Sequence, residues 1–313
     1  MLPATAVALA VLAALLAWPV PALFAPSRWA VRDPMVALVC WQAVGLAGGL
    51  SIIGALLVHG LAPWGGSLPA AAWAVVSGRG PVDPVRGDHW VALTLAGVLA
   101  AELVGVLALS WVRTARTRRR HRALLELVIL PAGEHPAGPD ARVLDHPAPV
   151  AFCIPGARPL LVLSSGIVAE LDDDQLAAVV AHERAHLREH HHLLLLPFVA
   201  WEAALPVLPA AARAHAAVRE LVEMRADDVA LRSLRGPAPR RTLAQAIVAA
   251  AGSAGPGSVP EGALAVGGGS LRDRVVRLLE PPQPLPATGR WTALAAAALL
   301  LLAPTALLLV PAL

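Results

Sequence analysis

The sequence contains no tyrosine and no lysine, only two cysteines, and few charged residues of either sign. Without tyrosine, no mechanism that uses a tyrosine hydroxyl to stabilise an oxyanion is open to this chain. Two cysteines, Cys40 and Cys153, do not make a disulfide framework. Charged residues form 15% of the chain and hydrophobic residues 57%, with a mean hydropathy of +0.64. This composition argues against one ordinary soluble domain and indicates a membrane protein.

Four stretches are long and apolar enough to cross a bilayer as helices, which takes about 20 residues. They are residues 4–24, 35–61, 90–112 and 291–311. We therefore divide the chain into an N-terminal membrane region (1–112), a central domain (113–290) and a C-terminal transmembrane helix (291–313).

Arginine placement predicts the orientation of these spans. Six arginines follow the third span directly, in residues 113–122 (RTARTRRRHR). The positive-inside rule then places 113–290 in the cytoplasm and both termini outside a cell membrane that the chain crosses several times. A basic cluster at such a site is a topology signal that faces membrane lipid. We therefore expect no direct nucleic-acid partner, despite the net charge of +3.

Two membrane features remain open at this point. Glu102 falls in the middle of the third span, where an ionisable group is costly; we expect a protonated carboxyl hydrogen-bonded to Gln42 or Ser51. Residues 192–212 are apolar but contain three prolines. We interpret them as a membrane-contacting or re-entrant hairpin, because a single crossing would separate the two helices on either side of it.

The central domain is expected to be α+β with a small sheet. Residues 150–154 and 160–163 are typical of short strands. Asp172 with Gln175 predicts a capping box that starts a helix running through VVAHERAHLREH. A second helix is expected at about 213–234, and a short amphipathic helix at 271–280 lying on the membrane. Residues 252–269, rich in glycine, predict a flexible loop.

Residues 182–186 read HERAH and match the pattern H-E-x-x-H. On a helix, positions i and i+4 share a face, so His182 and His186 can reach one zinc ion. Glu183 points to a neighbouring sector, where it can take a proton from a zinc-bound water. Zinc lowers the pKa of that water and polarises a scissile carbonyl. The alternative is an exposed, charged helix face without metal.

Three residues compete to be the third ligand. His190 continues the same face but lies about 12 Å along the axis from His182, too far for one zinc. His192 stands at the metzincin spacing, although Glu189 replaces the glycine that turns the chain there. Glu223 opens an E-x-x-A-D pattern on the second helix, and Asp227, one turn on, is placed to accept a hydrogen bond from a ligand imidazole. We prefer Glu223, and we expect Glu220 to be surface charge.

The stretches VAHERAHLREHHH and RELVEMRADD, preceded by PVAFCIPGARPLLVLSSGIVAELDDDQLAAV, resemble membrane-bound gluzincin-type zinc peptidases. The likeness is greatest to the BlaR/MecR-type signal-transducing peptidases, and the HtpX- and CAAX-protease-type families share the core pattern. It covers about residues 145–280. The beta-lactam sensors of that type carry an extracellular penicillin-binding domain after the last span, and we expect none in a sequence ending at Leu313.

The resemblance implies a site and a cofactor. It assigns Zn²⁺ to three ligands, a general base and an orienting residue: His182, His186 and Glu223, then Glu183, then Asp227. Arg219 is a further candidate, for polarising the substrate carbonyl. The predicted fold is thus a predominantly α membrane protein, with about four transmembrane helices and a cytoplasmic α+β gluzincin-like peptidase domain.

We expect an integral-membrane zinc endopeptidase that cuts a cytoplasmic or membrane-proximal protein, and family analogy names a transcriptional repressor as substrate. One alternative is an HtpX-like quality-control protease with many misfolded membrane substrates. The other is a non-catalytic signalling scaffold.

Overall fold

The computed structural model describes residues 2–25, 27–128, 141–155, 159–204, 209–252 and 268–309. The chain divides into two compact units. The first, called the membrane unit here, comprises 1–109, 196–218 and 285–313; the second, the central unit, comprises 110–195 and 219–284. Most of the predicted loop 252–269 lies outside the described residues.

Four helices are long and apolar enough to cross a membrane: Ala4–Phe24, Pro34–Trp64, Gly87–Arg113 and Ala287–Leu309. They coincide with the four predicted spans, and together with a small three-stranded sheet they confirm the predicted fold class. Residues 1–128 and the C-terminal end of the chain contain the elements α1 (Leu2–Ala17), α2 (Pro19–Phe24), α3 (Arg28–Arg32), α4 (Pro34–Leu61), η1 (Ala62–Trp64), α5 (Leu68–Val76), α6 (Gly87–Val128) and α13 (Ala287–Leu309).

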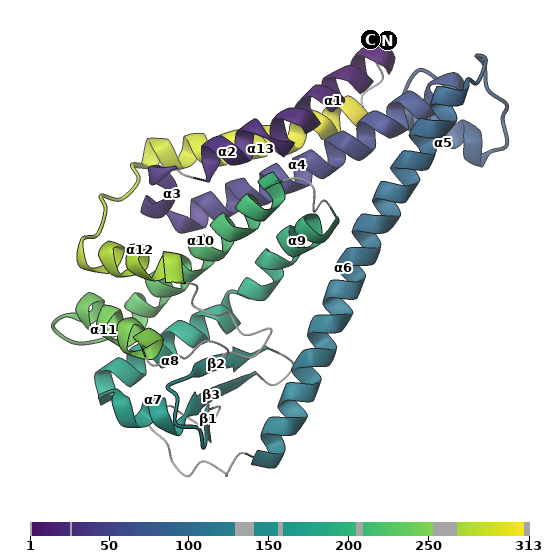
Figure 1. Cartoon of the computed structure of the whole chain (residues 1–313). Helices are drawn as coiled ribbons and strands as arrows, with labels where there is room; N and C mark the ends of the chain where they lie inside the picture. Colours follow the sequence, from purple (N-terminus) through teal and green to yellow (C-terminus); the bar gives the residue numbers. More distant parts are fainter. Residues whose placement is uncertain are drawn as a thin grey trace. The chain divides into compact units, whose positions relative to one another are not determined.

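Within the membrane unit, α1 and α13 both pack against α4 (Figure 1). A Cβ atom at Gly54 of α4 would lie 2.8 Å from Leu308 Cδ2, so the glycine permits the close approach of α13. Asp33 caps α4 by accepting a hydrogen bond from the Val36 amide, and its Oδ2 lies 2.9 Å from Arg290 Nε. The first turns of α4 and α13 are thus tied by charge as well as by packing.

The expectation that Glu102 bonds to Ser51 is wrong. Within the described part of the chain, Glu102 is exposed on α6 and the buried Ser51 hydroxyl has no hydrogen-bond partner. The physical reason is that only 11% of the apolar window of α6 is buried, so the middle of this helix faces outward.

Residues 192–212 are largely helical where they are described. Helix α9 (His191–Ala204) contains Pro197, and α10 (Pro209–Ser233) begins five residues after its end. Residues 196–218 group with the membrane unit. The membrane-contacting hairpin itself stays a prediction.

The central unit contains the sheet. Its strands are β1 (Ala141–Leu144), β2 (Ala151–Ile154) and β3 (Leu160–Ser164), in the order β1-β3-β2. Strand β1 runs parallel to β3, and β2 runs antiparallel to it. All residues of β3 are buried, as expected for a central strand packed on both faces. The sequence predicts β2 and β3 but not β1.

Helices of the central unit pack on this sheet and on one another. They include α7 (Ser165–Glu170), α8 (Asp173–Arg188), α11 (Pro239–Gly252) and α12 (Gly268–Leu279), with the second half of α10. Helix α8 packs on β2 and β3, and α11 packs on both α8 and α12. Leu163, Ile167, Leu243 and Leu278 are fully buried in the shared core. The predicted helix at 271–280 is therefore present as α12, and its place at the membrane stays a prediction.

Candidate metal centre

Helix α8 sets the spacing of the two histidines. The Asp172 side chain accepts a hydrogen bond from the Gln175 amide at 2.8 Å, and the Gln175 side chain accepts one from the Asp172 amide at 3.2 Å. This is the predicted capping box, and the acidic first turn also favours the helix dipole. The helix so fixed places His182 and His186 one turn apart, with 3.2 Å between their Nε2 atoms.

Glu223 of α10 completes a cluster with these histidines. Its Oε2 lies 3.4 Å from His182 Nε2, and its Oε1 lies 3.6 Å from His186 Nε2. Four ligands about 2.0–2.1 Å from a tetrahedral zinc ion are themselves about 3.3 Å apart. All three side chains are buried. The donor set and its spacing therefore fit Zn²⁺.

The electrostatics of the cluster favour positive charge between the donors. Burial opposes charge on His182, but contacts with Asp227 and Glu223 outweigh it and raise its pKa to about 9. Burial lowers the pKa of His186 to about 3. Burial also disfavours the charged form of Glu223, yet hydrogen bonding to His182 and the charges nearby hold its pKa well below its usual range. A cation is thus stabilised here by two buried carboxylates.

Glu183 has a different environment from the three candidate ligands. Removal of its carboxylate from water raises its pKa to about 7, against the opposing effect of His182. The Cys153 thiol of β2 acts in the opposite direction and lowers this pKa. Glu183 is therefore influenced both by the metal cluster and by strand β2, on which helix α8 packs.

Two residues orient His182, namely Asp227 and Arg274, and together they are called the short arm below. The Nδ1 atom of His182 lies 2.9 Å from Asp227 Oδ1, although the angle at the ring is not that of a well-formed hydrogen bond. Arg274 donates two hydrogen bonds to the Asp227 carboxylate, from Nε to Oδ2 at 2.9 Å and from Nη2 to Oδ1 at 2.7 Å. Neither side chain of this Asp227–Arg274 pair reaches the surface. The imidazole is thus directed by a carboxylate that is itself fixed.

Three residues orient His186, namely His191, Glu189 and Arg225, and together they are called the long arm below. The Nδ1 atom of His186 lies 2.9 Å from His191 Nδ1, and His191 Nε2 lies 3.3 Å from Glu189 Oε2. Arg225 in turn donates two hydrogen bonds to Glu189, at 2.6 and 2.7 Å. One set of tautomers satisfies the whole chain: His186 donates to His191, and His191 donates to Glu189. This leaves His186 Nε2 free to face the other donors.

The turn that brings His191 into place occurs at His190. The backbone of His190 has φ = 51°, the left-handed conformation that often ends a helix. From the sequence, a turn at Glu189 is less favourable because that position lacks glycine, and the candidates for a further ligand are His190 and His192, not His191. The chain does turn, one residue later, and the ring it presents to His186 is His191.

The remaining predicted residues lie apart from the cluster. Among the described residues, Glu223 is the one grouped with both histidines at ligand distances, and neither His190 nor His192 joins them. Arg219 and Glu220 are exposed on α10. The role of Arg219 at a substrate carbonyl stays a prediction.

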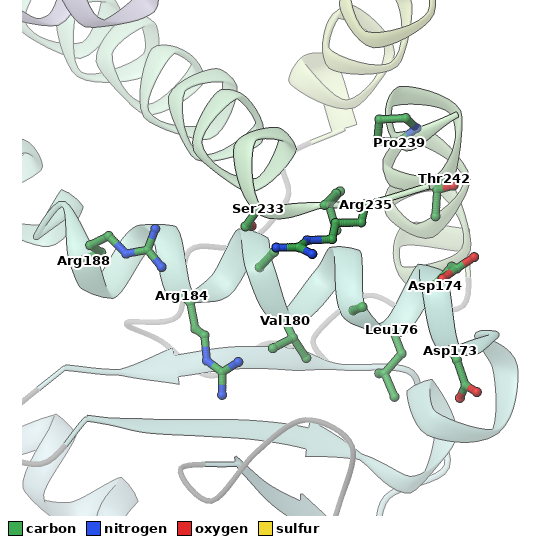
Figure 2. Close-up of a pocket in the computed structure, with 13 residues that line it drawn as sticks. Asp173, Asp174, Leu176, Val180, Arg184, Arg188, Ser233, Arg235, Pro239 and Thr242 are labelled. Atoms are coloured by element: carbon green, nitrogen blue, oxygen red, sulfur yellow. The ribbon is translucent and has the colours of Figure 1, made fainter. Parts of the chain in front are cut away.

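The opposite face of α8 borders a cavity of about 430 Å³. Figure 2 shows Arg184 and Arg188 at one end of this cavity and Asp173 and Asp174 at the other. Arg184 is two residues from His182, a rotation of about 200° around the helix. None of the candidate metal ligands lines this cavity, so α8 separates it from the metal cluster.

The comparison with protein families bears on this site. Residues 114–220 match the model of peptidase family M48. The match covers about a third of the chain; it includes His182, Glu183 and His186 and ends three residues before Glu223. No curated protein matches the chain. The match supports a metallopeptidase in general, while the place of Glu223 rests on the geometry given above.

Proposed function

We propose that this protein is an integral-membrane, zinc-dependent endopeptidase in which His182, His186 and Glu223 hold the metal. The observation that carries the proposal is a buried cluster beside Glu183: the two histidine Nε2 atoms lie 3.2 Å apart, and the Glu223 carboxylate reaches His182 at 3.4 Å with one oxygen and His186 at 3.6 Å with the other. The family match supports a metallopeptidase, and the four apolar helices support its insertion in a membrane.

When bound, Zn²⁺ supplies a Lewis acid that makes a coordinated water acidic and polarises the carbonyl to be cut. With the metal bound, Glu183 would accept a proton from that water and would pass it to the departing amine. A carboxylate with a pKa near 7 suits both tasks, since it can take up and release a proton near neutral pH.

Strand β2 is the proposed binding edge for the substrate. Among the described strands it pairs with β3 alone, so its other edge is open. Helix α8, which carries Glu183, packs on β2, and Cys153 of this strand is among the groups that influence the pKa of Glu183. An extended peptide added to β2 would gain backbone hydrogen bonds and bring its carbonyls toward the cluster. The partner is therefore a protein segment that can adopt an extended conformation.

Replacing Glu183 by Gln tests the proposal in the full chain in detergent. Glutamine keeps the size of the side chain but cannot accept the proton, so we expect cleavage to fall by roughly 10²–10⁴-fold. Zinc content, measured by atomic emission, is expected to stay at the wild-type level. Cleavage of an unfolded protein mixture by the variant at the wild-type rate would contradict the assignment of Glu183.

The substrate is proposed to lie on the cytoplasmic side, following the arginines at 113–122. A regulator such as a repressor and a broad set of misfolded membrane proteins are distinguished by identifying new protein termini in cells that express wild type or Glu183→Gln. One or two cleaved proteins support regulation, and many support quality control.

A further inference from the structure

Helix α12 carries two buried arginines that bond to α10 in the same way. Arg274 grips Asp227 with two hydrogen bonds, at 2.7 and 2.9 Å. Arg277 grips Asp228 with two hydrogen bonds, both at 2.8 Å. The side chains are 1% and 8% exposed. Paired carboxylates and guanidinium groups of this geometry are strong and direction-specific.

The two arginines differ in one contact. The remaining nitrogen of Arg274, Nη1, donates a hydrogen bond of 2.9 Å to Glu223 Oε2. Arg277 instead directs Nη1 to the Met224 carbonyl. Arg274 therefore joins the carboxylate beside His182 to the carboxylate proposed to bind zinc.

We propose that Arg274 is a positioning residue that holds Glu223 in a one-oxygen binding mode; this inference rests on the proposed function. Arg274 donates to Oε2, the oxygen beside His182 Nε2, and so directs the other oxygen, Oε1, which has no such hydrogen bond from Arg274, toward His186 Nε2 and the metal. A carboxylate that binds through one oxygen leaves room at the metal for water. Catalytic zinc sites need such an open position, whereas closed sites serve structure.

The charges agree with this role. Zn²⁺ and Arg274 together carry three positive charges, which match the carboxylates of Glu183, Glu223 and Asp227. Without Arg274, two buried carboxylates would lose their shared partner, and Glu223 would be free to turn both oxygens to the metal. A fork of two or more N–H groups is needed for this, so lysine is not an equivalent replacement.

The test compares Arg274→Gln with Arg277→Gln, which breaks the corresponding pair between α12 and α10, whose arginine is buried and whose Asp228 is 25% exposed. Each full-length protein is loaded with Co²⁺ in detergent, and its visible spectrum and cleavage kinetics are recorded. We expect the Arg274→Gln spectrum to weaken as the metal gains a ligand, and kcat to fall roughly 10–100-fold. Arg277→Gln should give the wild-type spectrum and a kcat close to wild type, with a similar loss of thermal stability.

Arg274→Lys keeps the positive charge, and it takes the place of Arg274→Gln in the test if the glutamine variant does not fold. A weakened spectrum in the lysine variant supports positioning by the guanidinium fork. Wild-type spectra for both Arg274 variants would overturn the inference while leaving the proposed function intact. If wild type itself binds no Co²⁺ and cuts no protein, the proposed function fails, whatever the variants do.

Discussion

The two candidate histidine ligands share one helix, yet their partners differ in kind and in burial. His182 faces a carboxylate directly, and this Asp227–Arg274 pair is 0% and 1% exposed. His186 faces a second ring, His191, and reaches a carboxylate only through it. The Glu189–Arg225 pair that ends this longer arm is 24% and 14% exposed. The short arm at His182 is shielded from solvent, and the long arm at His186 is partly exposed to it.

The difference indicates which arm controls the metal more strongly. A charge acts most strongly when it is near and shielded from water. Asp227 meets both conditions for His182, whereas Glu189 is one ring further from His186 and is screened by solvent. We therefore expect the short arm to set metal affinity and the long arm chiefly to fix the tautomer and tilt of His186.

Of the substitutions that test the two arms, Asp227→Asn should weaken zinc binding most. The amide keeps the shape of the side chain but removes the charge next to His182, so zinc affinity is expected to fall toward the upper part of a roughly 10–100-fold range. Competition with a chelator measures the Kd. Asp228→Asn is the matched control, since it removes the partner of Arg277 without touching a candidate ligand. Equal Kd values for the two variants would contradict the short arm.

His191→Ala should have a smaller effect. His186 then loses its Nδ1 acceptor, and we expect zinc affinity to fall roughly tenfold, at the lower end of the range for residues that support a ligand. His190→Asn is the control, because asparagine tolerates the left-handed backbone of that position. A loss from His191→Ala that exceeds the loss from Asp227→Asn would reverse the order of the two arms.

Much of this architecture was predictable because its signals are local. The four spans follow from apolar run length, and α8 follows from its capping box and its 3.6-residue period. The spacing of His182 and His186 then follows from helix geometry alone. Glu223 and Asp227 were expected from the E-x-x-A-D pattern, and the structure brings both within 3.6 Å of the histidines.

The rest depended on contacts that no local pattern encodes. Arg274 lies 47 residues from Asp227 in sequence, and at the level of sequence it belonged to an amphipathic helix expected at the membrane surface. Its burial follows from the packing of α11 and α12. Strand β1 has four residues and pairs with a strand about 20 positions away, so its sequence alone is a weak signal. His191 was missed because the turn was sought at Glu189.

The proposed ligand set is tested most directly by the zinc content of the full chain purified in detergent, for wild type, Glu223→Ala and His192→Ala. We expect about one zinc per chain in wild type and in His192→Ala, and loss of zinc in Glu223→Ala. Loss of zinc from His192→Ala with retention in Glu223→Ala would contradict the proposed ligand set. Absence of zinc from wild type would contradict the metal centre itself.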